Sequence, residues 1–155
     1  MQIRLVWQSF KMAQKSFYTK CFNEWKSGII TSPLLETCKS ITLDGDLSKH
    51  EQLFYTIKNA EVFKSAFQHM ADVVFEYGVK LEYVAVLLAF CFSLDEKMLQ
   101  MCDWYNTELL IDALHTALLK VKFDPTTFHQ RTKVHNNNCY KFLTIVPILL
   151  FCYYL

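Results

Sequence analysis

The chain is organised around a stretch near its middle, from residue 67 to residue 92. Its second half, residues 83–92, reads YVAVLLAFCF and contains no charged residue. A helix that is apolar on every face is buried on all sides, either in a protein core or in a membrane. From Leu81 to Leu94 such a helix is about 21 Å long, whereas a membrane span needs about 20 apolar residues. The pattern therefore predicts a central helix buried in a globular core.

The residues before this helix follow the spacing of an amphipathic helix. Five apolar residues recur at steps of four, three, four and three residues: Phe63, Phe67, Met70, Val74 and Tyr77. Residues with this spacing share one face of a helix. Gly78 follows the last of them, where a left-handed C-terminal cap is common. We expect one helix to end at Gly78 and the buried helix to begin two or three residues later.

Residues 2–26 have the pattern of a first amphipathic helix. Its apolar face consists of six residues at helical spacing: Ile3, Val6, Phe10, Ala13, Phe17 and Cys21. Arg4, Lys11 and Lys15 lie opposite this face, as expected of a side in contact with solvent. We therefore expect the apolar face to pack on the core.

Cap residues delimit further helices. Ser32 followed by Pro33 is typical of the N-cap and first position of a helix. Residues 53–57 predict a short helix, Asn59 caps the next one, and an apolar stripe over residues 110–121 predicts a helix after the central one. Gly and Pro number only 3 each, which favours long helices over a turn-rich β fold. The fold class we predict is all-α.

Composition narrows the class of protein. A chain of 155 residues is one domain with a sizeable core. A formal net charge of +1 provides no electrostatic reason to expect nucleic acid as a partner. The 6 Cys residues lack CxxC spacing and indicate buried thiols in a reducing compartment. Because Arg4, Lys11 and Lys15 interrupt any apolar core of a signal peptide, we expect an intracellular protein.

Catalytic and metal-binding patterns are missing from the sequence. His129 and His135 are six residues apart, which does not place two ligands on one helix face. His69 and His115 each have apolar neighbours on a predicted helix, which is typical of structural histidines. Three acidic residues are interpreted as solvated charges beside helices: Asp95, Glu96 and Asp103. Without a phosphate-binding loop or zinc spacing either, we expect no enzyme, no metal and no cofactor.

Two segments resemble motifs of the Bcl-2 family of apoptosis regulators. Residues 75–90, FEYGVKLEYVAVLLAF, match the spacing of its first homology motif at six positions: Phe75, Gly78, Val79, Val84, Ala85 and Phe90. The Asn-Trp-Gly-Arg centre of that motif is replaced by residues 80–83, Lys-Leu-Glu-Tyr. Residues 10–17, FKMAQKSF, resemble the fourth motif, whereas Gly45-Asp46 and Pro125 match the third and second motifs in position only. The small size and eroded motifs resemble those of virus-encoded survival factors.

The resemblance implies a Bcl-2-like helical bundle around a central hydrophobic helix hairpin. This domain would cover residues 1–135, and residues 136–155 would be a polar link with an apolar tail. The implied function is inhibition of apoptosis, in which a hydrophobic groove holds the amphipathic BH3 helix of a pro-apoptotic protein. The residues that the resemblance assigns to the groove are Leu53, Phe54, Ile57, Met70, Val74, Lys80, Glu82, Tyr83, Ala85, Val86 and Phe90.

Departures from the first motif imply a narrow range of partners. Tyr83 stands where the family has the arginine that pairs with an aspartate of the BH3 helix, and Lys80 lies three residues before it on the same side of the helix. Glu82 replaces a glycine that lets the two helices approach closely. A carboxylate buried without a partner is unfavourable by about 1–3 kcal/mol or more. We therefore expect few BH3 proteins to bind, and to bind weakly.

The tail and two other functions remain open at this point. Phe142 to Leu155 are uncharged, and at about 21 Å of helix with Pro147 in the middle they are short for a membrane span. We rank a membrane anchor first, ahead of a helix packed on the core and a helix folded into the groove. The expected location is the cytoplasm, or a mitochondrial or other intracellular membrane that the tail would contact. One alternative function is that of a viral immunomodulator that keeps the fold and binds a host signalling adaptor. The second alternative is that of a pore-forming death effector. A homodimer also remains open.

Overall fold

The computed structural model describes residues 2–41, 51–125 and 147–155, and within these ranges the chain is helical without strands. The labelled helices are α1 (Gln2–Ser27), α2 (Pro33–Lys39), α4 (Glu51–Phe54), α5 (Ala60–Val74), α6 (Leu81–Met101) and α7 (Thr107–Lys120). Residues 147–154 are helical as well. The all-α prediction is confirmed. The Gly45-Asp46 pair, His129 and His135 lie outside the described residues.

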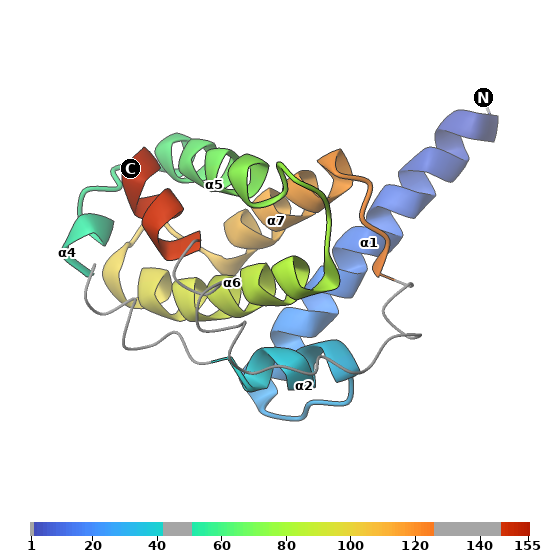
Figure 1. The fold of residues 1–155 in the computed structure, drawn as a ribbon, viewed down its shortest axis with the longest axis horizontal. Coiled ribbons are helices and arrows are strands. Elements are labelled where there is room, and N and C mark those ends of the chain that lie inside the picture. The colour runs from blue at the N-terminus through green and yellow to red at the C-terminus, as the bar shows by residue number, and fades with distance from the viewer. Residues whose placement is uncertain (1, 42–50, 126–146) are drawn as a thin grey trace.

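The central helix is α6, as the apolar stretch predicts. Residues 84–92 are all buried, and Figure 1 shows α6 (light green to yellow) in the middle, with α2 on one side, α5 on the other, and α1 and α7 beside it. Phe92 illustrates the packing, since its ring stacks on Trp25 at 4.4 Å and meets Phe22 edge-on at 4.8 Å. On another side, the Cys38 thiol of α2 approaches the Ala85 carbonyl at 3.5 Å.

Two predicted boundaries of the central helices are wrong. α5 ends at Val74 and not at Gly78; the chain then turns, and Gly78 adopts a φ of +122° inside the connection to α6. α6 begins at Leu81 as predicted but continues to Met101, past the predicted end at Leu94. The N-cap of α5 is confirmed, because the Asn59 side chain accepts a hydrogen bond from the Val62 N–H at 3.0 Å.

α1 packs with a different face from the one that the sequence predicts. Four of its described side chains are buried: Gln14, Tyr18, Cys21 and Phe22. On the predicted apolar face only Cys21 is fully buried among the described side chains, whereas Phe10 and Ala13 are exposed. The reason is that the strongest stripe of a single helix does not reveal the direction of its neighbours. Here α7 contacts the helix through Lys15, whose Nζ lies 2.7 Å from Asp112 Oδ1 and 3.0 Å from Glu108 Oε1.

Asp95 joins three helices from inside the bundle. It is only 2 % exposed, so the prediction of a solvated charge is wrong. Its carboxylate accepts hydrogen bonds from the Tyr105 hydroxyl at 2.5 Å and the Thr107 hydroxyl at 3.2 Å, and Lys26 Nζ of α1 lies 3.1 Å from it. Burial, and then the bond to Asp95, raise the pKa of Tyr105 well above its usual range, so the phenol remains a donor. Such partners are what makes a buried carboxylate tolerable.

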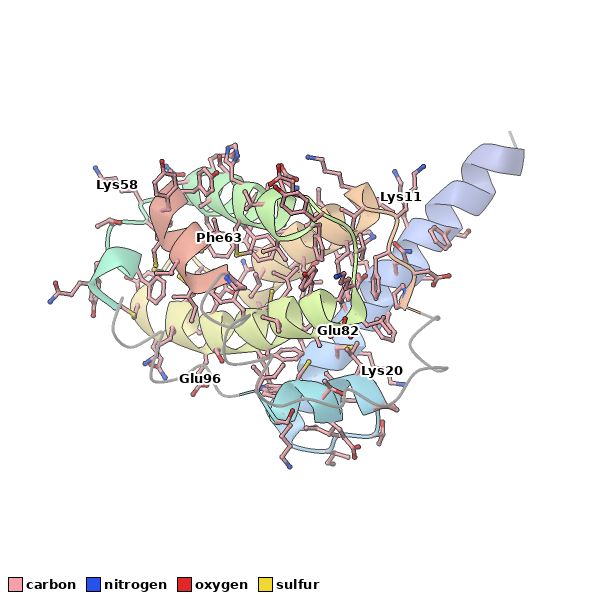
Figure 2. All side chains as sticks on the ribbon, in the orientation of Figure 1. Lys11, Lys20, Lys58, Phe63, Glu82 and Glu96 are labelled. Atoms are coloured by element: carbon pink, nitrogen blue, oxygen red, sulfur yellow. The ribbon has the colours of Figure 1, made fainter. Side chains whose placement is uncertain are left out.

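We predict that Asp95→Ala lowers the free energy of unfolding by about 1–3 kcal/mol, because the buried Tyr105 hydroxyl loses its acceptor. Chemical denaturation followed by circular dichroism measures this difference. The matched control is Glu96→Ala at the next, exposed position of α6 (Figure 2), which we expect to change stability by less than about 0.5 kcal/mol. Equal effects of the two substitutions would contradict a structural role for the Asp95 network.

Candidate functional site

The C-terminal helical segment packs against the bundle through Phe151. The Phe151 ring lies 5.8 Å from Phe63 of α5, 5.8 Å from Phe90 of α6 and 6.4 Å from Phe54 of α4, measured between ring centroids. All four side chains are fully buried. Figure 1 shows the segment (red) lying across α5 and α6, next to α4. We call Phe54, Phe63 and Phe90 the Phe151 site.

The segment is amphipathic in its docked position. Ile148 and Phe151 are buried, Leu155 is partly buried, and Leu149 and Tyr153 point to solvent. Ile148, Phe151 and Leu155 are spaced by three and four residues, the spacing of anchors in a helix that lies in an apolar groove. At its end, the Tyr154 ring stacks on His69 of α5, with centroids 4.8 Å apart and planes at 20°. The bundle thus holds a short helix by one apolar face.

Pro147 is the first described residue of this helical segment. Proline fits the first position of a helix because its missing N–H would have no partner there. Among the helices of the described residues, none has both the length and the apolarity that crossing a membrane requires. Residues 147–155 lie on the bundle and contact Phe54 and Phe90 of the predicted groove, so their arrangement fits both interpretations that keep the tail on the domain; residues 142–146 lie outside the described residues.

The structure places the predicted groove residues in three groups. Phe54 and Phe90 contact Phe151 directly. Four more are partly or fully buried in the same core: Ile57, Met70, Val74 and Val86. Ala85 is buried too, with its carbonyl on the side of α6 that faces Cys38 of α2. The side chain of Leu53 is outside the description.

The third group lies at the beginning of α6. Lys80 is exposed, and Glu82 and Tyr83 are partly exposed (Glu82 in Figure 2). The Lys80 ammonium lies 5.6 Å from the centre of the Tyr83 ring, within the range of a cation–π interaction. Tyr83 and Phe90 are separated by two helical turns, about 10 Å along α6. A partner helix of three to four turns can therefore reach from the Phe151 site to this charged end.

Sequence reasoning missed Phe63 and Phe151 as members of the site. Phe63 was on the predicted apolar face of α5, but the pattern does not separate a residue that lines a groove from one that packs inside the bundle. The signal in the tail was the spacing of Ile148, Phe151 and Leu155, which indicates one apolar side on a short helix. Trp104 and Tyr105 also flank Phe63, at 6.2 and 5.6 Å, and extend the aromatic cluster.

Other clusters in the described residues offer less chemistry. A cavity of about 370 Å³ between α5 and α7 has a mixed polar lining: Glu61, Lys64, Ser65, Gln68, Asp112, Ala113 and Thr116. The described residues contain no group of His, Cys, Asp and Glu suited to a metal ion. Burial raises the pKa of the Cys21 thiol to about 12 and that of Cys91 well above its usual value, so both are unreactive thiols.

A buried polar cluster lies between α1 and α7. Gln14 Nε2 donates a hydrogen bond to the Phe123 carbonyl at 3.2 Å. Three further polar atoms are buried without a partner among the described residues: Gln14 Oε1, the Tyr18 hydroxyl and His115 Nε2. Burial lowers the pKa of His115 from its usual value, and the charge of Lys15 lowers it further. The imidazole is therefore held in its neutral form more strongly in the folded than in the unfolded chain.

We predict that this histidine makes the protein less stable on acidification. Because the folded pKa is depressed, the unfolded chain binds more protons, and stability falls as the pH decreases through the unfolded value of about 6.5. The measurement is the melting temperature from about pH 7.5 to pH 5.5. His115→Gln should reduce the slope of this dependence, and an unchanged slope would show that other groups cause it.

No model of a protein family matches the chain, no curated protein matches it, and no solved structure matches it. The site is therefore described by its own geometry. Aromatic side chains of α4, α5 and α6 hold a short amphipathic helix, and Lys80, Glu82 and Tyr83 lie at the beginning of α6.

Proposed function

We propose that this protein is an inhibitor of apoptosis with a Bcl-2-like fold, which sequesters the BH3 helix of a pro-apoptotic protein at the Phe151 site. The observation that carries the proposal is the docked helix of residues 147–154, whose Phe151 is fully buried among aromatic rings of three helices. The bundle thus has a place that accepts an amphipathic helix by its apolar face, which is the binding mode proposed here.

The position of this place supports the proposal further. The resemblance to the Bcl-2 family assigned Phe54 and Phe90 to a groove, and both are contacts of Phe151. Aromatic side chains are also typical of the anchors that dominate helix recognition, because each removes a large apolar area from water. A partner helix would insert an apolar side chain where Phe151 now lies.

Binding of a partner at this place requires the tail to leave it. Burying a phenylalanine side chain stabilises the docked tail by about 1.5–3 kcal/mol, which corresponds to about a tenfold to hundredfold lower apparent affinity for a competing helix. The released tail would be available to an intracellular membrane. We infer that the chain binds its partner weakly when the tail is docked and that loss of the Phe151 anchor relieves this competition.

The alternative proposal is a Bcl-2-fold immunomodulator that binds a host signalling adaptor and no BH3 helix. The same burial of Phe151 favours it, because a groove that keeps its own tail has no room for another helix. The two functions differ in one measurable property, which is the binding of BH3 peptides by the full-length protein and by a variant whose tail is detached.

We predict that Phe151→Ala in the full-length chain increases the affinity for at least one BH3 peptide by about tenfold or more. Fluorescence polarisation with a panel of labelled BH3 peptides measures the dissociation constants. The matched control is Tyr153→Ala, which removes an aromatic ring that is 80 % exposed on the same segment and should leave the affinities unchanged. If neither the natural chain nor Phe151→Ala binds any peptide, the adaptor-binding alternative replaces this proposal.

The charged end of the site determines which partners fit. Lys80 lies over the Tyr83 ring, so its ammonium is near the place where the conserved aspartate of a BH3 helix would need a cation. A lysine at this place offers a point charge and no planar fork for two parallel hydrogen bonds. The Glu82 carboxylate adds a side chain and a like charge in the same region, which disfavours an acidic partner. A narrow range of partners follows.

We predict that the double variant Tyr83→Arg, Glu82→Gly binds more peptides of the panel than the natural chain does. The arginine supplies a bidentate partner for the aspartate, and the glycine removes a side chain from the contact. The double variant and the natural residues at these two positions should be compared in the Phe151→Ala background, so that the docked tail does not mask the change in binding. Tight binding of the whole panel without these substitutions, or no change with them, would contradict this explanation of selectivity.

A further inference from the structure

The docked tail shows which kind of side chain the Phe151 site accepts. The Phe151 ring lies 5.8 Å from both Phe63 and Phe90, and its plane makes angles of 71° and 63° with theirs. Aromatic rings favour such edge-to-face contacts, because the positive edge of one ring faces the negative face of the other. The third ring, Phe54, is tilted by 51° at 6.4 Å. An aliphatic side chain would fill part of this space without making these contacts, so the site is shaped for an aromatic anchor.

A second aromatic contact lies at the edge of the same site. The Tyr154 ring stacks on His69 of α5, with centroids 4.8 Å apart and planes at 20°. Tyr154 follows Phe151 by three residues, and side chains with this spacing lie on the same side of a helix. The bundle therefore contacts two aromatic side chains of the docked helix, about one helical turn apart.

The two aromatic positions differ in their access to water. Phe151 is 0 % exposed, and the rings around it are those of phenylalanines, which carry no hydrogen-bonding atom. A tyrosine at this position would bury its hydroxyl without a partner from these side chains, which is unfavourable. Tyr154, in contrast, is 36 % exposed, and a tyrosine suits a position with one apolar side and one wet side. Phenylalanine therefore fits the buried position and tyrosine the exposed one.

We propose that the site selects a partner helix with a phenylalanine anchor and a second aromatic residue three positions later, which stacks on His69. This inference rests on the proposed function in one respect, namely that a partner helix replaces the tail. Two aliphatic side chains complete the pattern, at the positions of Ile148 and Leu155, which are buried and partly buried. The partner is thus an amphipathic helix with two aromatic residues on its apolar face, and His69 is a specificity-determining residue outside the predicted groove.

The tail of a second copy has the same pattern but is a less favourable occupant. The structure shows residues 147–155 docked on the bundle of their own chain. A segment tethered to its own site has an effective concentration of about millimolar, which a separate copy does not reach. A partner overcomes this advantage through a longer helix, because about three to four turns reach from the Phe151 site to Tyr83 at the beginning of α6.

The test uses tail-derived peptides and the full-length Phe151→Ala variant, in which the tail has lost its anchor. Each peptide contains residues 147–155 followed by alanine and lysine residues to a total of about 18, because shorter isolated helices are marginal in water. Fluorescence polarisation compares the natural peptide with its Phe151→Leu, Tyr154→Ala and Tyr153→Ala forms. Tyr153→Ala is the matched control, since it removes the same ring from a position that is 80 % exposed and contacts Tyr154 of the same segment edge-on.

We expect the Phe151→Leu peptide to bind about tenfold more weakly than the natural peptide, because two edge-to-face contacts are lost. The Tyr154→Ala peptide should bind about fivefold more weakly, and the Tyr153→Ala peptide no more than about twofold. Adding His69→Ala to the protein should weaken the natural peptide by about the same factor as Tyr154→Ala does. It should have no further effect on the Tyr154→Ala peptide, because the two side chains form one contact.

A second measurement does not depend on the folding of Phe151→Ala, which circular dichroism checks. Hydrogen exchange at residues 147–155 of the full-length chain reports how often the tail leaves the site. Phe151→Leu should increase this exchange about tenfold, and Tyr153→Ala should leave it nearly unchanged. Equal binding of the phenylalanine and leucine peptides, or equal exchange of the natural and Phe151→Leu chains, would overturn the aromatic selectivity.

The remaining outcomes separate this inference from the proposed function. If His69→Ala weakens the natural and Tyr154→Ala peptides equally, the role of His69 is overturned. A dimer of the natural chain that Phe151→Ala abolishes in light scattering would make a second copy the occupant and overturn the assignment to a partner. If the tail-derived peptides bind with the expected order and no BH3 peptide binds, the selectivity is supported and only the proposed function falls.

Discussion

The structure depends on the burial of α6. Nine consecutive residues, 84–92, are removed from water, and a helix with apolar side chains in every direction needs cover in every direction. Each neighbouring element provides part of this cover: Phe22 and Trp25 of α1 lie on Phe92, and α2 approaches Ala85. No single neighbour is wide enough to enclose a helix, so the order of the other elements around α6 follows from this requirement.

The tail also covers part of α6. Phe151 lies on Phe90 and also contacts α4 and α5, so that residues 147–155 complete the cluster rather than merely touch it. A partner helix could replace the tail only by providing similar apolar area, since leaving Phe90 and Phe63 exposed would be unfavourable by about 25 cal/mol per Å². The proposed function and the stability of the resting chain therefore rest on the same aromatic rings.

Asp95 shows that the core also depends on polar groups. A carboxylate near the end of the apolar run is retained inside the bundle because Lys26 of α1, Thr107 of α7 and Tyr105 of the connection between α6 and α7 satisfy it. These contacts hold α1, α6 and α7 in one arrangement, which apolar packing alone specifies less strictly. The opposite case is the cluster of Gln14, Tyr18 and His115, where polar atoms are buried without partners among the described residues. The polar contacts of α1 thus differ: Lys26 pairs with a satisfied carboxylate, whereas Gln14 and Tyr18 carry buried oxygen atoms without a partner among the described residues.

The sequence by itself determined the helical class, the position of the central helix and the cap at Asn59, because these depend on composition, on periodicity and on hydrogen bonds between residues close in the chain. It also indicated Phe54 and Phe90 as neighbours of one site, through a resemblance of spacing. Tertiary structure decided the rest. Helices that are distant in sequence determine which face of α1 is buried, why Asp95 points inward and where Phe151 packs. No local sequence pattern contains the relative positions of these helices. A stripe predicts that a face is apolar; only the packed bundle determines whether that face meets the core, the tail or the surroundings.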